Sequence, residues 1–270
     1  MQRGGDLSEK NIDNPNEQND KEQKERIIKV ALAIFLAIFL VALSVILLHE
    51  GTDREEVATY TTATVDASVK RLENPIDFDA LREGNKDIYA WIKIDDTEVD
   101  YPIVQSKTSD SFYLRHKAED KSWTPSGAIY TEMQNSKGFN DSVTVIYGHN
   151  GYAESMFTTL HKFEKKEFFD SHPYFYIYTP TKRLTYQVVS AFKYDNRHIL
   201  NSFDFTNGND IVEFFTTVKD PDSTVKNVRE QLDERLTIES KVVVLSTCIT
   251  NQKSSRYLVC GVLVNNEKTY

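Results

Sequence analysis

Apolar residues follow three successive patterns along the 270-residue chain. Residues 1–26 are dominated by Asn, Gln, Asp, Glu and Lys without apolar periodicity, which predicts a disordered tail. Residues 27–48 are apolar except for Lys29 and Ser44. From about Leu72 onward, short apolar runs alternate with turn-forming residues. We therefore expect a tail, an apolar segment and a folded domain over residues 72–270.

The apolar segment has the length and composition of a membrane anchor. About 20 apolar residues span a bilayer, whereas a cleavable signal peptide has a shorter apolar region and a small-residue cleavage site. The basic residues near the segment lie mainly on its amino side, which places that side in the cytoplasm. They are Lys21, Lys24, Arg26 and Lys29. We expect a single-pass anchor over 27–48, a stalk over 49–71 and an extracellular domain beyond it.

The pattern after Leu72 is mainly that of β-strands. Alternating or continuous apolar runs predict strands at 90–94, 99–104, 128–131, 143–147, 174–178, 184–194, 241–245 and 257–264. Pro102 indicates an edge position for its strand. The two last strands are rich in Val and Leu, which favours central positions in a barrel or sandwich.

Two segments depart from the strand pattern and predict helices. Asp77 is placed to cap a short helix that starts near Phe78. Between Asp210 and Lys219, apolar residues recur at helical spacing on one face. The domain is therefore mainly β with few helices.

Composition excludes two classes of protein. The formal net charge is −9 and the pI is about 5.3, so the chain lacks the basic surface that nucleic-acid binding requires. Cys248 and Cys260 are the two cysteines, which excludes a disulfide scaffold. One bridge between them stays open as an alternative, although a strand after a short loop would carry Cys260 away from Cys248. A free thiol in an extracellular domain requires an explanation.

Cys248 follows an apolar strand, at a point where a loop begins. Reactive groups are commonly held at such positions, although an isolated cysteine is just as often a small buried hydrophobe. Arg256 starts the next strand after a short connection, residues 249–255, so the two residues should be neighbours. An arginine there can favour a thiolate and stabilise a developing oxyanion. A surface cation is the plainer interpretation of Arg256 taken alone.

Among six histidines, His149 is the best candidate for proton transfer. It comes directly after the apolar strand 143–147, and histidine exchanges protons near neutral pH. His49 adjoins the apolar segment, and His161 and His172 flank a charged segment, which predicts solvated side chains. Spacing does not exclude His116 or His198.

These residues, in this order, resemble the class B sortases. The resemblance is carried by Tyr147-Gly148-His149-Asn150, by Leu245-Ser246-Thr247-Cys248 and by Arg256 behind an amino-terminal anchor. It extends through Asp77-Phe78-Asp79-Ala80-Leu81, Tyr89-Ala90-Trp91-Ile92, Tyr101-Pro102-Ile103-Val104-Gln105 and Phe112-Tyr113-Leu114-Arg115-His116, covering roughly residues 74–264.

The resemblance implies a closed eight-stranded β-barrel with amino-terminal helices and a further helix before the cysteine strand. It also implies a cysteine transpeptidase that cleaves a threonine-containing sorting signal of exported proteins and transfers the acyl group to an amine of the cell wall or a pilin. Cys248, His149 and Arg256 are then nucleophile, proton-transfer group and oxyanion stabiliser. Ser246, Thr247 and Leu114 correspond to signal-binding positions. Ile249 and Thr250 stand where some members carry acidic residues, and Ala90 stands where glycine is more usual.

Two alternatives remain open from the sequence. The same three residues suit a cysteine hydrolase that passes the acyl group to water. A membrane-tethered binding domain with a structural Cys248 is the alternative from another class. No Cys-x-x-Cys pair or metal-ligand spacing is present, so we expect no cofactor and no metal.

Overall fold

The computed structural model describes residues 72–270, apart from 152, 153, 231 and 233, together with Arg26 and Lys29. The predicted tail, anchor and stalk therefore lie almost entirely outside the described residues. Within the described part, no helix is both long and apolar enough to cross a membrane.

Strands make up most of the described domain, as the sequence predicts. The strands are β1 (Ile88–Lys93), β2 (Asp100–Val104), β3 (Ile129–Tyr130), β4 (Val143–Tyr147), β5 (Tyr174–Thr179), β6 (Lys182–Asp195), β7 (Lys226–Val228), β8 (Val242–Ile249) and β9 (Gln252–Lys268). The helices are α2 (Phe78–Gly84), η1 (Phe112–Leu114), η2 (Thr158–Glu164), α3 (Lys166–Ser171), α4 (Ile199–Ser202) and α5 (Gly208–Lys219), where η denotes a 3-10 helix.

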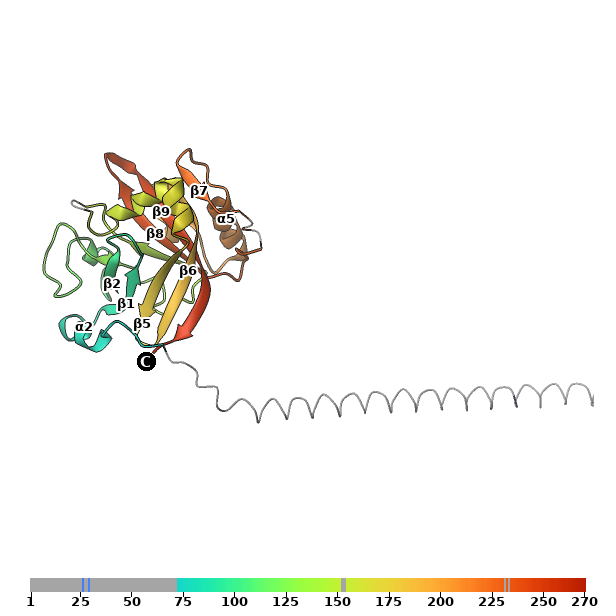
Figure 1. Ribbon diagram of the computed structural model, residues 1–270, viewed down its shortest axis with the longest axis horizontal. Helices are drawn as coiled ribbons and strands as arrows, with labels where there is room; N and C mark the ends of the chain where they lie inside the picture. The colour runs from blue at the N-terminus through green and yellow to red at the C-terminus, as the bar shows by residue number, and fades with distance from the viewer. Residues whose placement is uncertain (1–25, 27–28, 30–71, 152–153, 231, 233) are drawn as a thin grey trace, which may run out of the picture. The chain divides into compact units, whose positions relative to one another are not determined.

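Eight of the strands form a closed barrel. Their order is β5-β1-β2-β3-β4-β8-β9-β6, and β5 also pairs with β6, which closes the ring (Figure 1). The short strand β7 is added outside the ring through its pairing with β6. This confirms the predicted mainly β fold and the eight-stranded barrel. Closure leaves these eight strands without a free edge.

β8 lies in the middle of the barrel wall, between β4 and β9. It runs parallel to β4 and antiparallel to β9. Along β8, Val243 and Leu245 belong to the interior core, whereas Val242 and Val244 pack in the outer cluster that includes α5. Burial on both faces explains the continuous apolar run.

The prediction that Pro102 marks an edge strand is wrong. β2 has β1 on one side and β3 on the other. However, β3 pairs only with Ile103 and Val104, while Pro102 stands opposite Trp91 of β1. β3 therefore begins one residue past Pro102, the one position of β2 that has no amide hydrogen to donate.

Both predicted helices are present. The carboxylate of Asp77 accepts a hydrogen bond of 3.0 Å from the amide of Ala80 and caps α2. α5 begins after its cap residue Asn207 and buries Ile211, Phe214, Phe215 and Val218. This apolar stripe covers the outer face of the barrel near β8.

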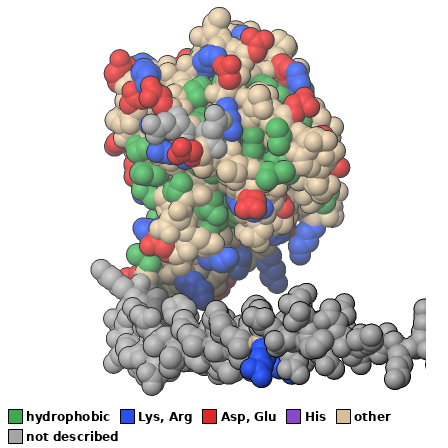
Figure 2. All heavy atoms as spheres, turned by 90° about the vertical axis from the view of Figure 1, so that its right-hand side faces the viewer, with side chains coloured by type: hydrophobic (Ala, Val, Ile, Leu, Met, Phe, Trp, Pro, Cys, Tyr) green, Lys and Arg blue, Asp and Glu red, His purple; other side chains and the backbone are tan. Residues whose placement is uncertain are grey.

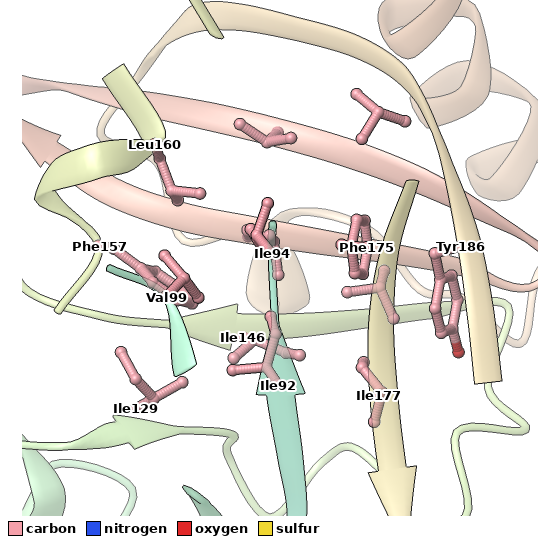
Figure 3. Close-up of a cluster of buried hydrophobic side chains, with 14 of the residues drawn as sticks. Ile92, Ile94, Val99, Ile129, Ile146, Phe157, Leu160, Phe175, Ile177 and Tyr186 are labelled. Carbon is pink, nitrogen blue, oxygen red and sulfur yellow. The ribbon is translucent and has the colours of Figure 1, made fainter. Parts of the chain in front are cut away.

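The barrel interior is filled by aliphatic and aromatic side chains from several strands. Figure 3 shows Ile92, Ile146 and Ile177 pointing into the space between the strands, with the ring of Phe175 beside that of Tyr186. The two rings are stacked with centroids 5.1 Å apart. In contrast, acidic, basic and apolar side chains are interspersed on the outer face in Figure 2.

Gly261 of β9 provides a test of the interior packing. A Cβ atom at this position would lie 2.7 Å from Cζ of Phe175 and 3.1 Å from Cβ of Tyr186. We expect Gly261→Ala to lower the free energy of unfolding by about 1–3 kcal/mol, because the Phe175 ring must move in a packed core. Urea unfolding measures this, with exposed Asn265→Ala on the same strand as control, expected to stay within about 0.5 kcal/mol. An unchanged unfolding midpoint for Gly261→Ala would contradict this packing.

Candidate active site

Cys248 lies near the end of β8, where the buried strand reaches the surface. The six residues before it in β8 are buried, and Cys248 is the first with an exposed side chain. The strand therefore holds the thiol at the rim of the barrel, as the sequence predicts.

Arg256 stands directly opposite Cys248 on β9. Residues that face each other across antiparallel strands project from the same face of the sheet, so the guanidinium and the thiol share one side of the wall. The predicted neighbourhood is confirmed, but the connection is shorter than the expected loop 249–255. Ile249 already pairs with Gln252, and the turn passes through Asn251 with φ of 62°.

His149 reaches the same end of the barrel from β4. Tyr147 pairs with Ser246, and the amide of Gly148 donates a 3.1 Å hydrogen bond to the Ser246 carbonyl. The parallel register then brings His149 level with Cys248. Nε2 of His149 lies 2.9 Å from the Leu114 carbonyl oxygen, so Nε2–H donates and Nδ1 is left as the other exchange position.

A cavity of about 260 Å³ joins these residues. Cys248, His149 and Arg256 all line it, as do the predicted signal-binding residues Ser246, Thr247 and Leu114. The structure thus brings all six predicted site residues to one cavity. Leu114 is 37% exposed, whereas Ser246 and Thr247 are buried.

The same cavity contains an acidic residue that sequence reasoning missed. Glu132 is buried, and its carboxylate lies 2.8 Å from Nε2 of His198. Burial raises the pKa of Glu132, and the hydrogen bond and charge of His198 act in the opposite direction. Both residues line the cavity. An acidic residue just after a short strand gives no pattern by which it could have been found.

The prediction that His161 is a solvated surface residue is wrong. Its side chain is 23% exposed, and its ring stacks on Tyr257 with centroids 5.0 Å apart. Nε2 of His161 lies 3.1 Å from the carbonyl oxygen of Cys248. The 3-10 helix η2 turns this side chain toward β8 and β9, an arrangement that the charged composition of the segment does not reveal.

His172 and His116 are also packed rather than freely solvated. His172 stacks on Phe168, and its Nε2 lies 2.9 Å from the Asp96 carboxylate. His116 stacks on Phe112 with centroids 3.9 Å apart. Neither residue lines the cavity that holds Cys248.

Cys260 is a core residue, as predicted. Its side chain is fully buried, and burial raises the pKa of its thiol to about 12. Both cysteines are free. Cys260 stands opposite Val244, four residues before Cys248 on β8, so the strand keeps the two thiols apart.

The two thiols should therefore differ in reactivity. We expect iodoacetamide to modify Cys248 alone in the native protein at neutral pH, since Cys260 is inaccessible and held in its neutral form. Both should react in concentrated guanidinium chloride, which provides the control for total thiol. Intact mass and peptide mapping measure the sites; native modification of Cys260, or an inert Cys248, would contradict the site geometry.

Comparisons with known proteins agree with this geometry. The sortase domain family matches residues 92–264. The chain is similar to sortase B of Listeria monocytogenes, with 31% identity over 186 residues that cover 68% of this chain and 72% of the relative.

Solved structures are similar as well. Clostridium perfringens sortase B is 26% identical, with a TM-score of 0.62 over 70% of this chain and all (100%) of that chain. The Staphylococcus aureus sortase B–substrate complex is 26% identical, with a TM-score of 0.61 over 70% of this chain and 84% of that chain. From its sequence, its closed barrel and these relatives, the chain belongs to the sortase family as a class B sortase, a cysteine transpeptidase.

Proposed function

We propose that Cys248 is the nucleophile of this transpeptidase, His149 its proton-transfer group and Arg256 its oxyanion stabiliser. The observation that carries the assignment is the direct pairing of Cys248 with Arg256 at the rim of a cavity that His149 also lines. A thiolate needs a neighbouring cation and a proton carrier to perform acyl transfer near neutral pH.

In the first half of the reaction, the Cys248 thiolate attacks the carbonyl carbon of threonine in a sorting signal. The carbonyl π electrons move to oxygen, and the oxyanion forms beside the Arg256 guanidinium, which stays charged throughout. The peptide C–N bond then breaks, and the protonated His149 gives its proton to the leaving amine. The products are a thioester on Cys248 and the released carboxyl-terminal peptide.

In the second half, an amine from a cell-wall peptide or a pilin attacks the thioester. His149 accepts the proton that the attacking nitrogen loses, the C–S bond breaks, and a new amide forms. Both halves pass through an oxyanion at the same place. One arginine can therefore serve both steps.

We propose that the sorting signal binds in the cavity beside Cys248. Leu114 is partly exposed there and offers an apolar contact, while Ser246 offers a hydroxyl. Thr247 is 2% exposed, so it forms part of the cavity wall without offering its side chain to the peptide. The related Staphylococcus aureus enzyme was solved as a substrate complex, which supports peptide binding by this class.

Membership in the family indicates an enzyme associated with the cell surface. We further propose the topology that the sequence predicts: tail 1–26 in the cytoplasm, anchor 27–48, stalk 49–71 and extracellular catalytic domain 72–270. The family match over 92–264 falls within that last segment. An anchored enzyme would meet exported proteins as they emerge from the membrane.

The transpeptidase and hydrolase alternatives are separated by adding an amine acceptor. The full chain in detergent is incubated with a panel of threonine-containing sorting peptides and an amine, and products are identified by mass spectrometry. We expect an amide product from the wild type and a loss of at least about 10³-fold for Cys248→Ala, which lacks the nucleophile.

Cys260→Ala is the matched control and should keep its activity, because Cys260 is buried away from the cavity. Cleavage to the free acid alone, despite saturating amine, would favour the hydrolase. Equal activity of Cys248→Ala and wild type would contradict the assignment of the nucleophile.

A further inference from the structure

The carbonyl group of Cys248 lies just beyond the end of its neighbouring strand. Successive carbonyls of a strand point to opposite edges. The Ser246 carbonyl accepts from Gly148 on the β4 side, so the Cys248 carbonyl faces the same side, where β4 has already ended. The backbone of the nucleophile therefore needs a partner other than a strand.

Two side chains occupy the place that β4 leaves. Nδ2 of Asn150 lies 3.0 Å from the Cys248 carbonyl oxygen, and Nε2 of His161 lies 3.1 Å from the same oxygen. A carbonyl oxygen has two lone pairs and can accept both hydrogen bonds. Together they fix the peptide plane that follows Cys248, and so the direction in which its side chain leaves the backbone.

The hydrogen count at Asn150 indicates which form of His161 fits this arrangement. Nδ2 of Asn150 lies near three atoms: the Cys248 oxygen at 3.0 Å, Oγ1 of Thr250 at 3.0 Å and Nε2 of His161 at 3.3 Å. An amide has two hydrogens for these three positions. The conflict disappears when Nε2 of His161 carries a proton and donates to the Cys248 oxygen.

The other ring nitrogen of His161 also faces an acceptor. Nδ1 lies 2.6 Å from Oε1 of Glu164. A neutral imidazole carries a proton on one nitrogen only, whereas the imidazolium donates from both. With both nitrogens facing acceptors, the doubly protonated ring satisfies every contact, and the Glu164 carboxylate balances its charge.

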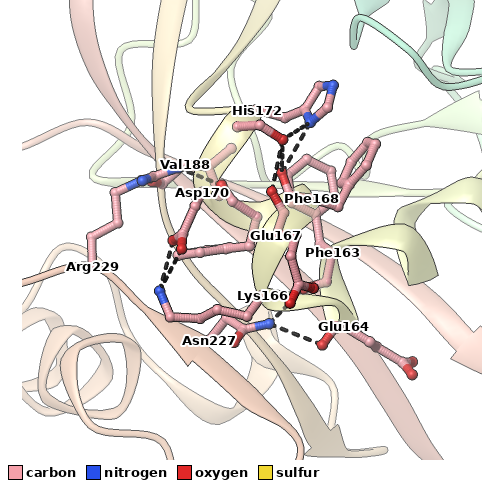
Figure 4. A network of polar contacts seen from close by, with 12 residues as sticks. Phe163, Glu164, Lys166, Glu167, Phe168, Asp170, His172, Val188, Asn227 and Arg229 are labelled. Atoms are coloured by element: carbon pink, nitrogen blue, oxygen red, sulfur yellow. Dashed lines mark hydrogen bonds and ion pairs between the residues drawn. The ribbon is translucent and has the colours of Figure 1, made fainter.

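The segment that carries this pair is attached to the barrel. The side-chain amide of Asn227 on β7 donates to the carbonyls of Phe163 and Glu164 at 2.8 and 3.1 Å (Figure 4). The ring of Tyr257 on β9 supports the flat face of His161. Among the described contacts, the titratable groups facing the His161 ring are thus Glu164 from its own helix and Tyr257 from β9.

We propose that His161, paired with Glu164, is a positioning residue for the nucleophile: its doubly protonated ring donates to the Cys248 carbonyl and holds the backbone from which the thiol projects. This inference rests on the proposed role of Cys248. His161 acts through the backbone and touches no reacting atom.

The test compares His161→Ala, His161→Gln and Glu164→Gln in the full chain. We expect His161→Ala to lower kcat/KM about tenfold with little change in KM, since the thiol loses its orientation. His161→Gln should recover most of this loss, because the glutamine amide can donate to the Cys248 carbonyl. The second readout is the rate of Cys248 alkylation by iodoacetamide at neutral pH. His161→Ala should lower this rate, because the thiol loses its orientation, and His161→Gln should restore most of it. Glu164→Gln should lower the rate by less than His161→Ala, because the His161 ring keeps its contact with the Cys248 carbonyl and loses only the acceptor that faces Nδ1.

His172→Gln is the matched control, because His172 forms a similar pair with Asp96 and has no described contact with Cys248. Thermal unfolding of each variant shows whether it is folded. If His161→Ala does not fold, the comparison of His161→Gln with wild type tests the inference. If the three variants behave like His172→Gln in both readouts, His161 and Glu164 form only a surface ion pair and the inference fails. Alkylation needs no sorting peptide, so this outcome is distinct from failure of the proposed transpeptidase roles.

Discussion

The hydrogen-bonded pairing of β8 with β4 and β9 is the constraint on which the site depends. The parallel pairing with β4 brings His149 level with Cys248, and the antiparallel pairing with β9 places Arg256 opposite it. A shift of one residue in either register would turn a site residue to the other face of the wall. The two-sided burial of Val242, Val243, Val244 and Leu245 stabilises this register, so core packing and the alignment of the site share one cause.

Charge at the rim of the barrel follows from the same arrangement. Arg256 stands opposite Cys248 on β9, and His149 lines the same cavity from the segment that follows β4. Cys248 is exposed, whereas burial holds Cys260 in its neutral form. The barrel therefore contains two thiols with different chemistry on neighbouring strands. Cys248 lies near the end of β8, and Cys260 lies deeper in the wall, on β9 opposite Val244.

Periodicity predicted the parts of the structure that depend on local patterns. The eight barrel strands, the helix α5 and the place of Cys248 near the end of its strand follow from apolar spacing and turn residues. The short strand β7 was not predicted, and Arg256 was expected to start its strand, whereas β9 begins four residues earlier at Gln252. Contacts between distant segments could not be predicted, because no sequence pattern links the residues that form them. Examples are the contact of Glu132 with His198 and that of His161 with the Cys248 carbonyl. Pro102 was misassigned because β3 starts one residue past it, so that the proline fits in a strand that is not at an edge.

The central claim is that Cys248 and Arg256 act together on one carbonyl group in the cavity that His149 lines. A crystal structure of the enzyme carrying a sorting-peptide analogue covalently attached to Cys248 tests it most directly. The account predicts that the peptide's threonine lies in that cavity and that the oxygen derived from its carbonyl is within hydrogen-bonding distance of the Arg256 guanidinium. An oxygen directed away from Arg256, with the peptide bound on another face of the barrel, would contradict it.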